Sequence, residues 1–442
     1  MMNWQQLLCA DRLQRQDAKH DPGRSPFQQD LDRIVFSSSF RRLAHKTQVH
    51  PLTENDHVHT RLTHSIEVAS VGRSLGANVG MHIASNQPSL NVSPDAFGYI
   101  VQAACLAHDI GNPPFGHSGE EALSAWFREY FDSKDGMMVG RSLGNKATDF
   151  TKFEGNAQGF RILTRLENNR DAGGLQLTHA VIGTFLKYPR LSISGDSKYV
   201  GHKKFSSFIA EEEYLREVAC KCGLLIRGAY WSRHPLSFLV EAADDICYGI
   251  VDIEDGFELG NLAYSEACAI LEPIAGALDK KDLSEPDVVA KLRAVAIGKM
   301  VTAVAEVFRR NEENILDGTF NRELISETSF AECIRKAKDV ARERIYQSNS
   351  KVKLELAGYE IIWGLLTYLV PVAIELDKND YDINLLPDRQ KKYNRLISPN
   401  GLRGVKNMYE ALLRITDFIS GMTDRYALSM YRNLKGISLQ NQ

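Results

Sequence analysis

Helical periodicity is the feature of this sequence that most limits its fold. Strand-like alternation of apolar and polar residues is confined to one short candidate ribbon at 191–208. Amphipathic helices without a sheet can bury their apolar faces only against other helices. We therefore expect an all-α fold with loops at 85–95, 132–152 and 189–206. Apolar residues recur at helical spacing in the segments 62–84, 99–107, 120–131, 237–257, 262–278, 286–313, 328–347, 353–376 and 405–434.

The longest apolar run, residues 361–376, is short for a membrane span, which needs about 20 residues. It contains Gly364 and Pro371, and it predicts a buried helix, or two helices that meet near the proline. The first twenty residues have no apolar stretch of the kind that marks a secretory signal. Seven cysteines without a CxxC pair favour reduced thiols. These features predict a cytoplasmic protein with no membrane partner.

Histidines are concentrated in one part of the chain, since eight of the twelve lie between residues 45 and 117. Histidine is the commonest metal ligand and the usual acid or base at neutral pH. In the segment ACLAHDIGNPPFGHSGEE, His108 and Asp109 end an apolar helix, and glycines and prolines then prevent regular structure. His117 and Glu120 follow one helical turn apart, a spacing at which a carboxylate can orient an imidazole. The segment therefore predicts a metal-ligand pair and an acid/base pair.

Two other segments could complete the coordination of a metal. His64 begins a helix, and residues 241–258 form a helix with seven acidic side chains and no basic one. Asp244, Tyr248 and Asp252 follow at intervals of four on one face of that helix. Apolar neighbours favour burial of Asp244, and a buried carboxylate needs a partner, which a metal would supply. Imidazole with carboxylate suits Mn, Fe, Ni, Co or Zn better than Ca.

The order His64, His108-Asp109, Asp244 matches the H…HD…D pattern of the HD-domain metal-dependent phosphohydrolases. Longer segments resemble the bacterial dGTP triphosphohydrolases, over about residues 20 to 435. The resemblance implies an HD-domain helical bundle with an additional helical C-terminal region. It divides the chain into an N-terminal arm (1–24), a phosphohydrolase core (25–270) and a C-terminal region (271–442) that completes the nucleotide pocket and an oligomer interface. The matching segments include RLTHSIEVASVGR (61–73), AHDIGNPPFGHSGEEAL (107–123), FEGNAQGFRIL (153–163), HPLSFLVEAADDICYGIVDIEDG (234–256) and DFISGMTDRYA (417–427).

The activity that the resemblance implies is hydrolysis of a dNTP at the α-phosphorus. The products are a deoxynucleoside and inorganic tripolyphosphate, dGTP is the favoured substrate, and the role is control of dNTP pools. Carried over position by position, the acid/base pair is His117 with Glu120. The resemblance rejects Asp245, the neighbour of Asp244, as a ligand. The implied ligands of a divalent metal (Mn or Mg, with Fe, Co or Ni as further candidates) are His64, His108, Asp109 and Asp244.

The resemblance also implies a set of substrate contacts. An aromatic ring beneath the sugar can exclude a 2′-hydroxyl sterically, and an acidic side chain at the base can accept hydrogen bonds from guanine N1–H and N2–H. The implied phosphate contacts are Arg61, Asn156, Lys187, Tyr188 and Lys204. The implied sugar contacts are Gln48, Tyr248 and Asp252, and the implied base contacts are Val49 and Glu355.

Two alternative functions stay open at the level of the sequence. One is an HD phosphohydrolase that acts on monophosphates, cyclic dinucleotides or alarmones. The other is a nucleotide-sensing protein that binds nucleic acid, because residues 1–50 carry eight basic and five acidic side chains and the 187–204 segment is also basic. Such patches could hold single-stranded DNA, although the net charge of the whole chain is only −3. The relatives further imply a homo-oligomer, a tetramer or hexamer built from dimers.

Overall fold

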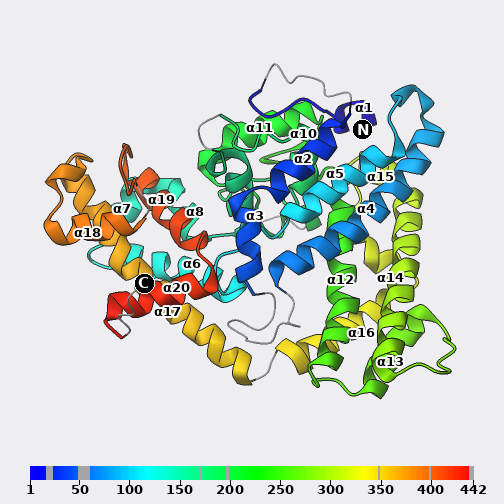
Figure 1. Ribbon diagram of the computed structural model, residues 1–442. Helices are drawn as coiled ribbons and strands as arrows, with labels where there is room; N and C mark the ends of the chain where they lie inside the picture. Colours follow the sequence, from blue (N-terminus) through cyan, green and yellow to red (C-terminus); the bar gives the residue numbers. More distant parts are fainter. Residues whose placement is uncertain are drawn as a thin grey trace.

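The computed structural model describes residues 1–15, 23–47, 60–168, 172–195, 199–346, 349–397 and 400–437. Helices make up nearly all of its regular structure (Figure 1), so the all-α prediction is confirmed. The α-helices are α1 (Trp4–Leu7), α2 (Pro26–Val35), α3 (Ser38–Arg42), α4 (Arg61–Asn86), α5 (Pro94–Ala107), α6 (Gly116–Asp132), α7 (Met137–Leu143), α8 (Thr148–Thr151), α9 (Gly155–Arg161), α10 (His179–Phe185), α11 (Glu212–Lys221), α12 (Ser237–Glu258), α13 (Tyr264–Ala275), α14 (Glu285–Arg310), α15 (Glu312–Leu316), α16 (Ala331–Ala341), α17 (Asn349–Lys378), α18 (Asp388–Ile397), α19 (Met408–Ser420) and α20 (Asp424–Lys435).

Short single-turn elements connect many of these helices. Within the described residues the strands are β1 (Ile226–Arg227) and β2 (Tyr230–Trp231), which pair antiparallel around a turn at Gly228. The short elements are η1 (Leu43–His45), η2 (Pro88–Leu90), η3 (Gly144–Ala147), η4 (Ile162–Leu166), η5 (Val200–His202), η6 (Ile209–Glu211), η7 (Leu324–Glu327), η8 (Arg342–Tyr346) and η9 (Ile383–Leu385).

Two expectations about local structure were wrong. The ribbon expected at 191–208 is reduced, in the described residues, to a single bridge between Leu191 and Ser207. The loop expected at 132–152 contains α7 and α8, because apolar side chains such as Phe150 anchor this polar, glycine-containing segment in a core. The segment 405–434 is helical as expected and contains α19 and α20, and Thr423 starts α20 by capping it.

The helices pack around two hydrophobic cores. The first core collects α1–α5 with α10–α16, and the second collects α6–α8 with α17–α20. In Figure 1, α17–α20 accordingly lie apart from α12–α14. The chain passes from the first core to the second between Ile110 and Phe115, directly after the His108-Asp109 pair. The cores thus group the helices differently from the domain ranges 1–24, 25–270 and 271–442, which stay predictions.

The antiparallel pair α4 and α5 brings two of the expected metal ligands together. Gly76 permits the close approach, because a Cβ there would lie 2.6 Å from the carbonyl oxygen of Phe97 and 2.9 Å from the Cα of Gly98. The N-terminus of α4 carries His64, and the residue that ends α5 is His108. Their rings consequently meet edge to face, with centroids 5.4 Å apart.

The apolar segment 361–376 lies within one helix, α17, which contains Pro371 rather than breaking there. Val352–Lys378 is long and apolar enough to cross a membrane by length and composition alone, but half of its most apolar window is buried inside the protein. Leu365, Leu369 and Leu376 are fully buried in the second core. This burial favours a core helix over a membrane span.

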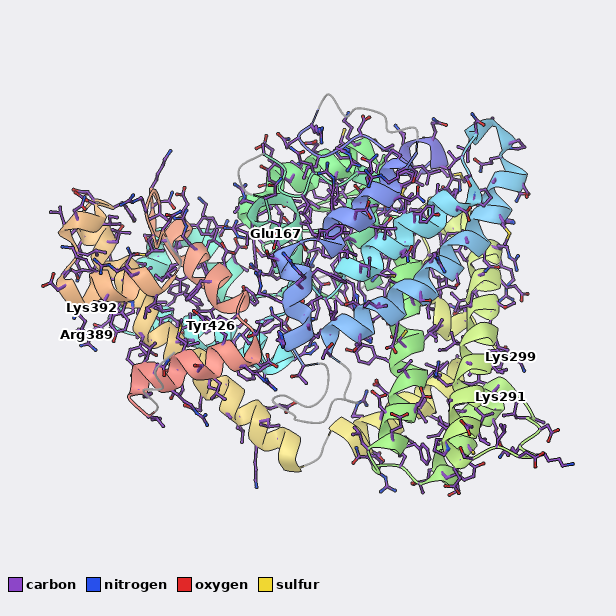
Figure 2. All side chains as sticks on the ribbon, viewed as in Figure 1. Glu167, Lys291, Lys299, Arg389, Lys392 and Tyr426 are labelled. Atoms are coloured by element: carbon purple, nitrogen blue, oxygen red, sulfur yellow. The ribbon has the colours of Figure 1, made fainter. Side chains whose placement is uncertain are left out.

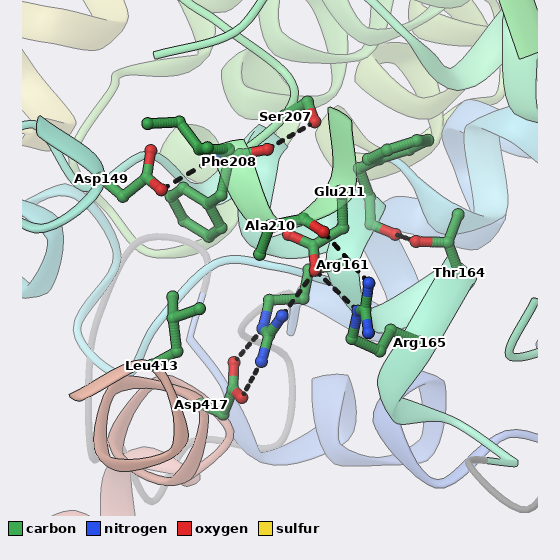
Figure 3. A network of polar contacts seen from close by, with 12 residues as sticks. Asp149, Arg161, Thr164, Arg165, Ser207, Phe208, Ala210, Glu211, Leu413 and Asp417 are labelled. Carbon is green, nitrogen blue, oxygen red and sulfur yellow. Dashed lines mark hydrogen bonds and ion pairs between the residues drawn. The ribbon is translucent and has the colours of Figure 1, made fainter. Parts of the chain in front are cut away.

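A buried ion-pair network joins the C-terminal region to the rest of the molecule (Figure 3). Arg161 in α9 donates two hydrogen bonds of 2.8 Å to the carboxylate of Asp417 in α19, and it contacts Glu211 at 2.5 Å. Arg165 also donates to Glu211, at 2.9 Å. Charged side chains far from this network, such as Lys291 of α14 and Arg389 of α18, instead project from the outer edges of the molecule (Figure 2).

Candidate active site

The four expected metal ligands converge from three helices. Nε2 of His64 lies 3.1 Å from Oδ1 of Asp244, and Nε2 of His108 lies 3.6 Å from the same oxygen. Nε2 of His108 is also 3.6 Å from Oδ1 of Asp109. A metal with bonds of about 2.0–2.2 Å holds its ligand atoms about 3–4 Å apart, and these separations match that spacing.

The tautomer of His108 suits a ligand. Its Nδ1 lies 2.7 Å from the carbonyl oxygen of Cys105, which can only accept a hydrogen bond. The proton therefore belongs on Nδ1, and the lone pair of Nε2 faces Asp109 and Asp244. The site therefore offers two imidazoles, of which that of His108 is oriented in this way, and two carboxylates. This set of ligands fits a divalent transition metal.

Both carboxylates are held in the charged form that a metal requires. Burial by itself would raise the pKa of Asp109, but Arg61, His108 and His64 keep it below its ordinary value. Burial likewise opposes ionisation of Asp244, but its hydrogen bond with His64 and the nearby His108 keep its pKa low. The adjacent Asp245 lies differently, because its carboxylate pairs with Lys338 of α16.

A cavity of about 500 Å³ opens beside these ligands. It brings together both expected acid/base residues, three of the four expected metal ligands and six of the expected substrate contacts, while His64 contacts the lining residue Asp244. The lining residues are Arg61, His108, Asp109, Asn112, His117, Glu120, Glu154, Asn156, Phe185, Lys187, Tyr188, Lys204, Val240, Glu241, Asp244 and Tyr248.

Three cations in the cavity lie beside carboxylates. Arg61 donates a 2.6 Å hydrogen bond to Asp109, Lys204 donates at 3.1 Å to Glu154, and Nζ of Lys187 is 3.4 Å from Glu241. An approaching phosphate group would compete for the same cations. The cavity is thus suited to bind an anion by exchange of ion-pair partners.

His117 and Glu120 share the cavity but are not hydrogen-bonded to each other, as far as the described residues show. Glu120 accepts a 2.7 Å hydrogen bond from the backbone N–H of Gly155 instead. Burial raises the pKa of Glu120, and burial together with the Glu120 charge raises the pKa of Glu154. Partial removal from water, with the charges of Lys204 and Arg61, lowers the pKa of His117. The His117 imidazole is therefore neutral at pH 7.

Gly155 leaves no room for a side chain in this arrangement. A Cβ at this position would lie 2.6 Å from Oε1 of Glu120 and 2.6 Å from Oδ1 of Asn112. We expect Gly155→Ala to displace Glu120 and to lower turnover by about 10- to 100-fold, the scale of an ångström-sized misplacement. Steady-state kinetics on the variant would measure the loss. Gly298→Ala, whose Cβ would meet nothing within 4 Å, is the matched control, and equal turnover in both variants would contradict the prediction.

Four expected substrate contacts are not among the described residues that line the cavity. Gln48 and Val49 fall outside the described residues. Asp252 is buried one turn beyond Tyr248 on α12, and Glu355 lies on α17, and neither is among the described residues that line the cavity. The roles proposed for these four residues therefore stay predictions.

Several residues that shape the site were missed by sequence reasoning. Glu154 and Glu241 line the cavity, and both lie in segments that resemble the family, 153–163 and 234–256, which was an available signal. Asn112 donates a 2.6 Å hydrogen bond to Asp109, and its backbone carbonyl accepts one of 2.5 Å from Lys46. Hydrogen-bonding partners of this kind orient metal ligands.

Asp424 of α20 reaches the same loop from the C-terminal region. It accepts a 3.0 Å hydrogen bond from the backbone N–H of Phe115, which has a left-handed φ of 63° and starts α6. It also accepts from the N–H and hydroxyl of Thr47, at 3.0 and 2.8 Å. A carboxylate from the end of the chain thereby sets the start of the helix that carries His117.

Comparison with known proteins matches these regions to established families. The HD domain family matches residues 61–157, and the phosphohydrolase-associated domain family matches residues 324–433. A deoxyguanosinetriphosphate triphosphohydrolase-like protein of Synechocystis sp. is 41% identical over 99% of this chain and 100% of its own length. The similarly named Pseudomonas aeruginosa protein is also 41% identical, over 99% of both chains. The deoxyguanosinetriphosphate triphosphohydrolase of Yersinia pestis is 31% identical over 92% of this chain and 93% of its own length. The chain belongs to the deoxyguanosinetriphosphate triphosphohydrolase family of HD-domain enzymes.

Proposed function

We propose that this enzyme hydrolyses a dNTP, with dGTP favoured, to the deoxynucleoside and inorganic tripolyphosphate. The observation that carries the proposal is one cavity lined by three of the proposed metal ligands, the proposed acid/base pair and three cations. The names of the relatives support dGTP as the substrate. Control of dNTP pools in the cytoplasm follows as the cellular role.

His64, His108, Asp109 and Asp244 would hold the divalent metal, with Mn or Mg first and Fe, Co or Ni as the other candidates. Such a metal supplies Lewis acidity toward a phosphoryl oxygen and lowers the pKa of a coordinated water. The side chains around the cavity then divide the remaining tasks. Lys187, Lys204 and Arg61 would bind the triphosphate, with Asn156 and Tyr188 beside them. The ring of Tyr248, whose centroid is 5.0 Å from that of His64, would pack against the sugar.

His117 is the proposed proton acceptor from the attacking water. Because its pKa lies below the ordinary value of 6.5, the neutral form that accepts a proton dominates at pH 7. Glu120, held by Gly155, would compensate the charge that His117 gains, and the proton would then pass to the departing 5′-oxygen. Each of these steps uses a group already in the cavity.

The pH dependence of kcat/KM tests the role of His117. For a base, activity is present above its pKa and is lost as the pH falls through that pKa, which we expect below 6.5 because burial and Lys204 lower it. We expect His117→Gln to remove this acid limb and to reduce kcat by about 10²- to 10⁴-fold. The profile is measured at saturating metal, so that proton competition at the ligands does not contribute. A limb on the alkaline side that depends on His117 would instead assign it as the general acid.

Product analysis tests the function as a whole. The purified protein is incubated with Mn²⁺ or Mg²⁺ and each of the four dNTPs, alone and mixed, and the products are separated by HPLC. Release of tripolyphosphate with the deoxynucleoside is the expected result, and stimulation in the mixture would show activation by a second nucleotide. Release of pyrophosphate or monophosphate would refute it, and turnover of monophosphates, cyclic dinucleotides or alarmones in its place would establish the other HD activity.

The proposed partners are further copies of the chain, in a dimer-based tetramer or hexamer, and single-stranded DNA. Light scattering measures the first. A gel shift at a series of salt concentrations measures the second, since binding to a polyanion weakens steeply with salt. Absence of a shift at low salt would remove DNA from the proposal.

A further inference from the structure

Lys187 belongs to a closed set of contacts that the proposed chemistry leaves unexplained. Its backbone carbonyl accepts a 2.8 Å hydrogen bond from Nε of Arg233, and its Nζ lies 3.4 Å from Oε1 of Glu241. Arg233 closes the ring with hydrogen bonds of 2.7 and 3.2 Å from its two Nη atoms to the Glu241 carboxylate. Both the backbone and the ammonium group of Lys187 are therefore fixed by this pair.

Lys187 is the most exposed member of this set. The exposed fraction of its side chain is 29%, against 8% for Glu241 and 0% for Arg233. The Arg233 guanidinium also lies 5.0 Å from the ring centre of Phe238 and 5.7 Å from that of Tyr188. A guanidinium held on every side has little freedom to move and makes a rigid support.

A carboxylate is unexpected in a cavity that receives a triphosphate, and Arg233 explains why Glu241 can be there. Glu241 alone would neutralise Lys187, but Arg233 supplies a second positive charge, so the three side chains together carry +1. Burial by itself would raise the pKa of Glu241, but Arg233 and Lys187 lower it to about 2, so it stays ionised at neutral pH. Glu241 also lies one helical turn before Asp244 on α12, which ties the position of Lys187 to the helix that carries a metal ligand.

We propose that Arg233 and Glu241 are positioning residues, which hold the Lys187 ammonium group toward the phosphates of the substrate and leave it a net positive charge. This inference rests on the proposed function, because it assigns Lys187 to the triphosphate. Arg233 need not touch the substrate, and it acts through Lys187.

A double-mutant cycle tests this dependence. Arg233→Met, Lys187→Ala and the double variant are compared with the wild type in kcat, KM and thermal midpoint, with the dNTP that the wild type turns over best. We expect Arg233→Met alone to lower kcat/KM by roughly 10- to 100-fold, the scale of a small misplacement of a binding group. In the Lys187→Ala background, Arg233→Met should lower kcat/KM by less than about threefold, because the ammonium group that Arg233 positions is gone.

Equal fold-losses in the two backgrounds would overturn the inference, because a merely structural role for Arg233 predicts additive effects. If Arg233→Met does not fold, the nearly isosteric Glu241→Gln takes its place in the same cycle, with the same two outcomes. Arg335→Met, on the exposed face of α16, is the control for loss of an arginine and should leave kcat/KM unchanged. A wild type that hydrolyses no dNTP would refute the proposed function, whereas an active wild type with an additive cycle would refute the positioning role alone.

Discussion

Replacing Asp244 by Asn should lower turnover by about a thousandfold and abolish stoichiometric metal binding. The carboxylate oxygen of Asp244 lies 3.1 Å from His64 and 3.6 Å from His108, so the substitution removes the negative charge of a proposed ligand at the centre of the cluster. A metal stabilises transition-state charge by several kcal/mol, and about 4 kcal/mol corresponds to roughly a thousandfold in rate. Turnover is measured at a fixed metal concentration, and metal content is measured by mass spectrometry after dialysis. Asp244→Asn is a cleaner test than Asp109→Asn, which would also leave Arg61 without its ion-pair partner.

Asp245→Asn is the matched control, because it makes the same chemical change at the next residue of α12. The carboxylate of Asp245 pairs with Lys338, so its loss should leave metal content unchanged and turnover within about twofold, as for an ion pair near the surface. Normal metal content and turnover in Asp244→Asn would contradict the ligand assignment. Loss of the metal in Asp245→Asn alone would move that assignment to the neighbouring residue.

Replacing Arg161 by Met should lower the free energy of unfolding by about 3–5 kcal/mol, the cost of leaving a buried charge without its partner. Arg161 supplies hydrogen bonds to Glu211, which is 0% exposed, and to Asp417 (Figure 3). Among the described residues, the side chain of Glu211 would keep its contact with Arg165, and that of Asp417 would keep its contact with Gln158. The midpoint of urea unfolding measures the loss.

The free energy of unfolding that Arg161→Met removes should be larger at pH 8 than at pH 5.5. Burial already raises the pKa of Glu211 above its ordinary value, although Arg161 and Arg165 oppose that rise, and removal of Arg161 would raise it further. A folded state that binds more protons than the unfolded state loses stability as the pH rises toward the folded pKa. Protonation at low pH would therefore relieve part of the cost, and a loss that does not change with pH would contradict this account.

Arg165→Met is the matched control for this effect. Arg165 also donates to Glu211, but its side chain is 44% exposed. Solvent-exposed ion pairs contribute about 0–1 kcal/mol to the free energy of unfolding. We expect its substitution to lower stability by no more than about 1 kcal/mol. Equal losses in the two arginine variants would show that burial does not decide the strength of this network.

The helices that carry the catalytic motifs were predictable from the sequence. Periodicity placed a helix at 62–84 and the structure has Arg61–Asn86, and it placed another at 237–257 where the structure has Ser237–Glu258. Their apolar faces repeat over many turns, so local pattern alone determines the element. Prediction failed at 132–152, because a polar segment with a few buried aromatic residues folds only against a partner elsewhere in the chain.

The sequence by itself determined which candidate groups lie close along the chain, such as the adjacent His108 and Asp109, and His117 and Glu120 one helical turn apart. Only the tertiary structure decided which distant groups meet them. Asp424 reaches the N–H of Phe115 across 309 residues, and Arg233 holds the backbone of Lys187 across 46. The physical reason is that a buried charge must find an opposite charge or a hydrogen-bond partner. Which partner it finds depends on how the two cores pack, and no local pattern in the sequence records that packing.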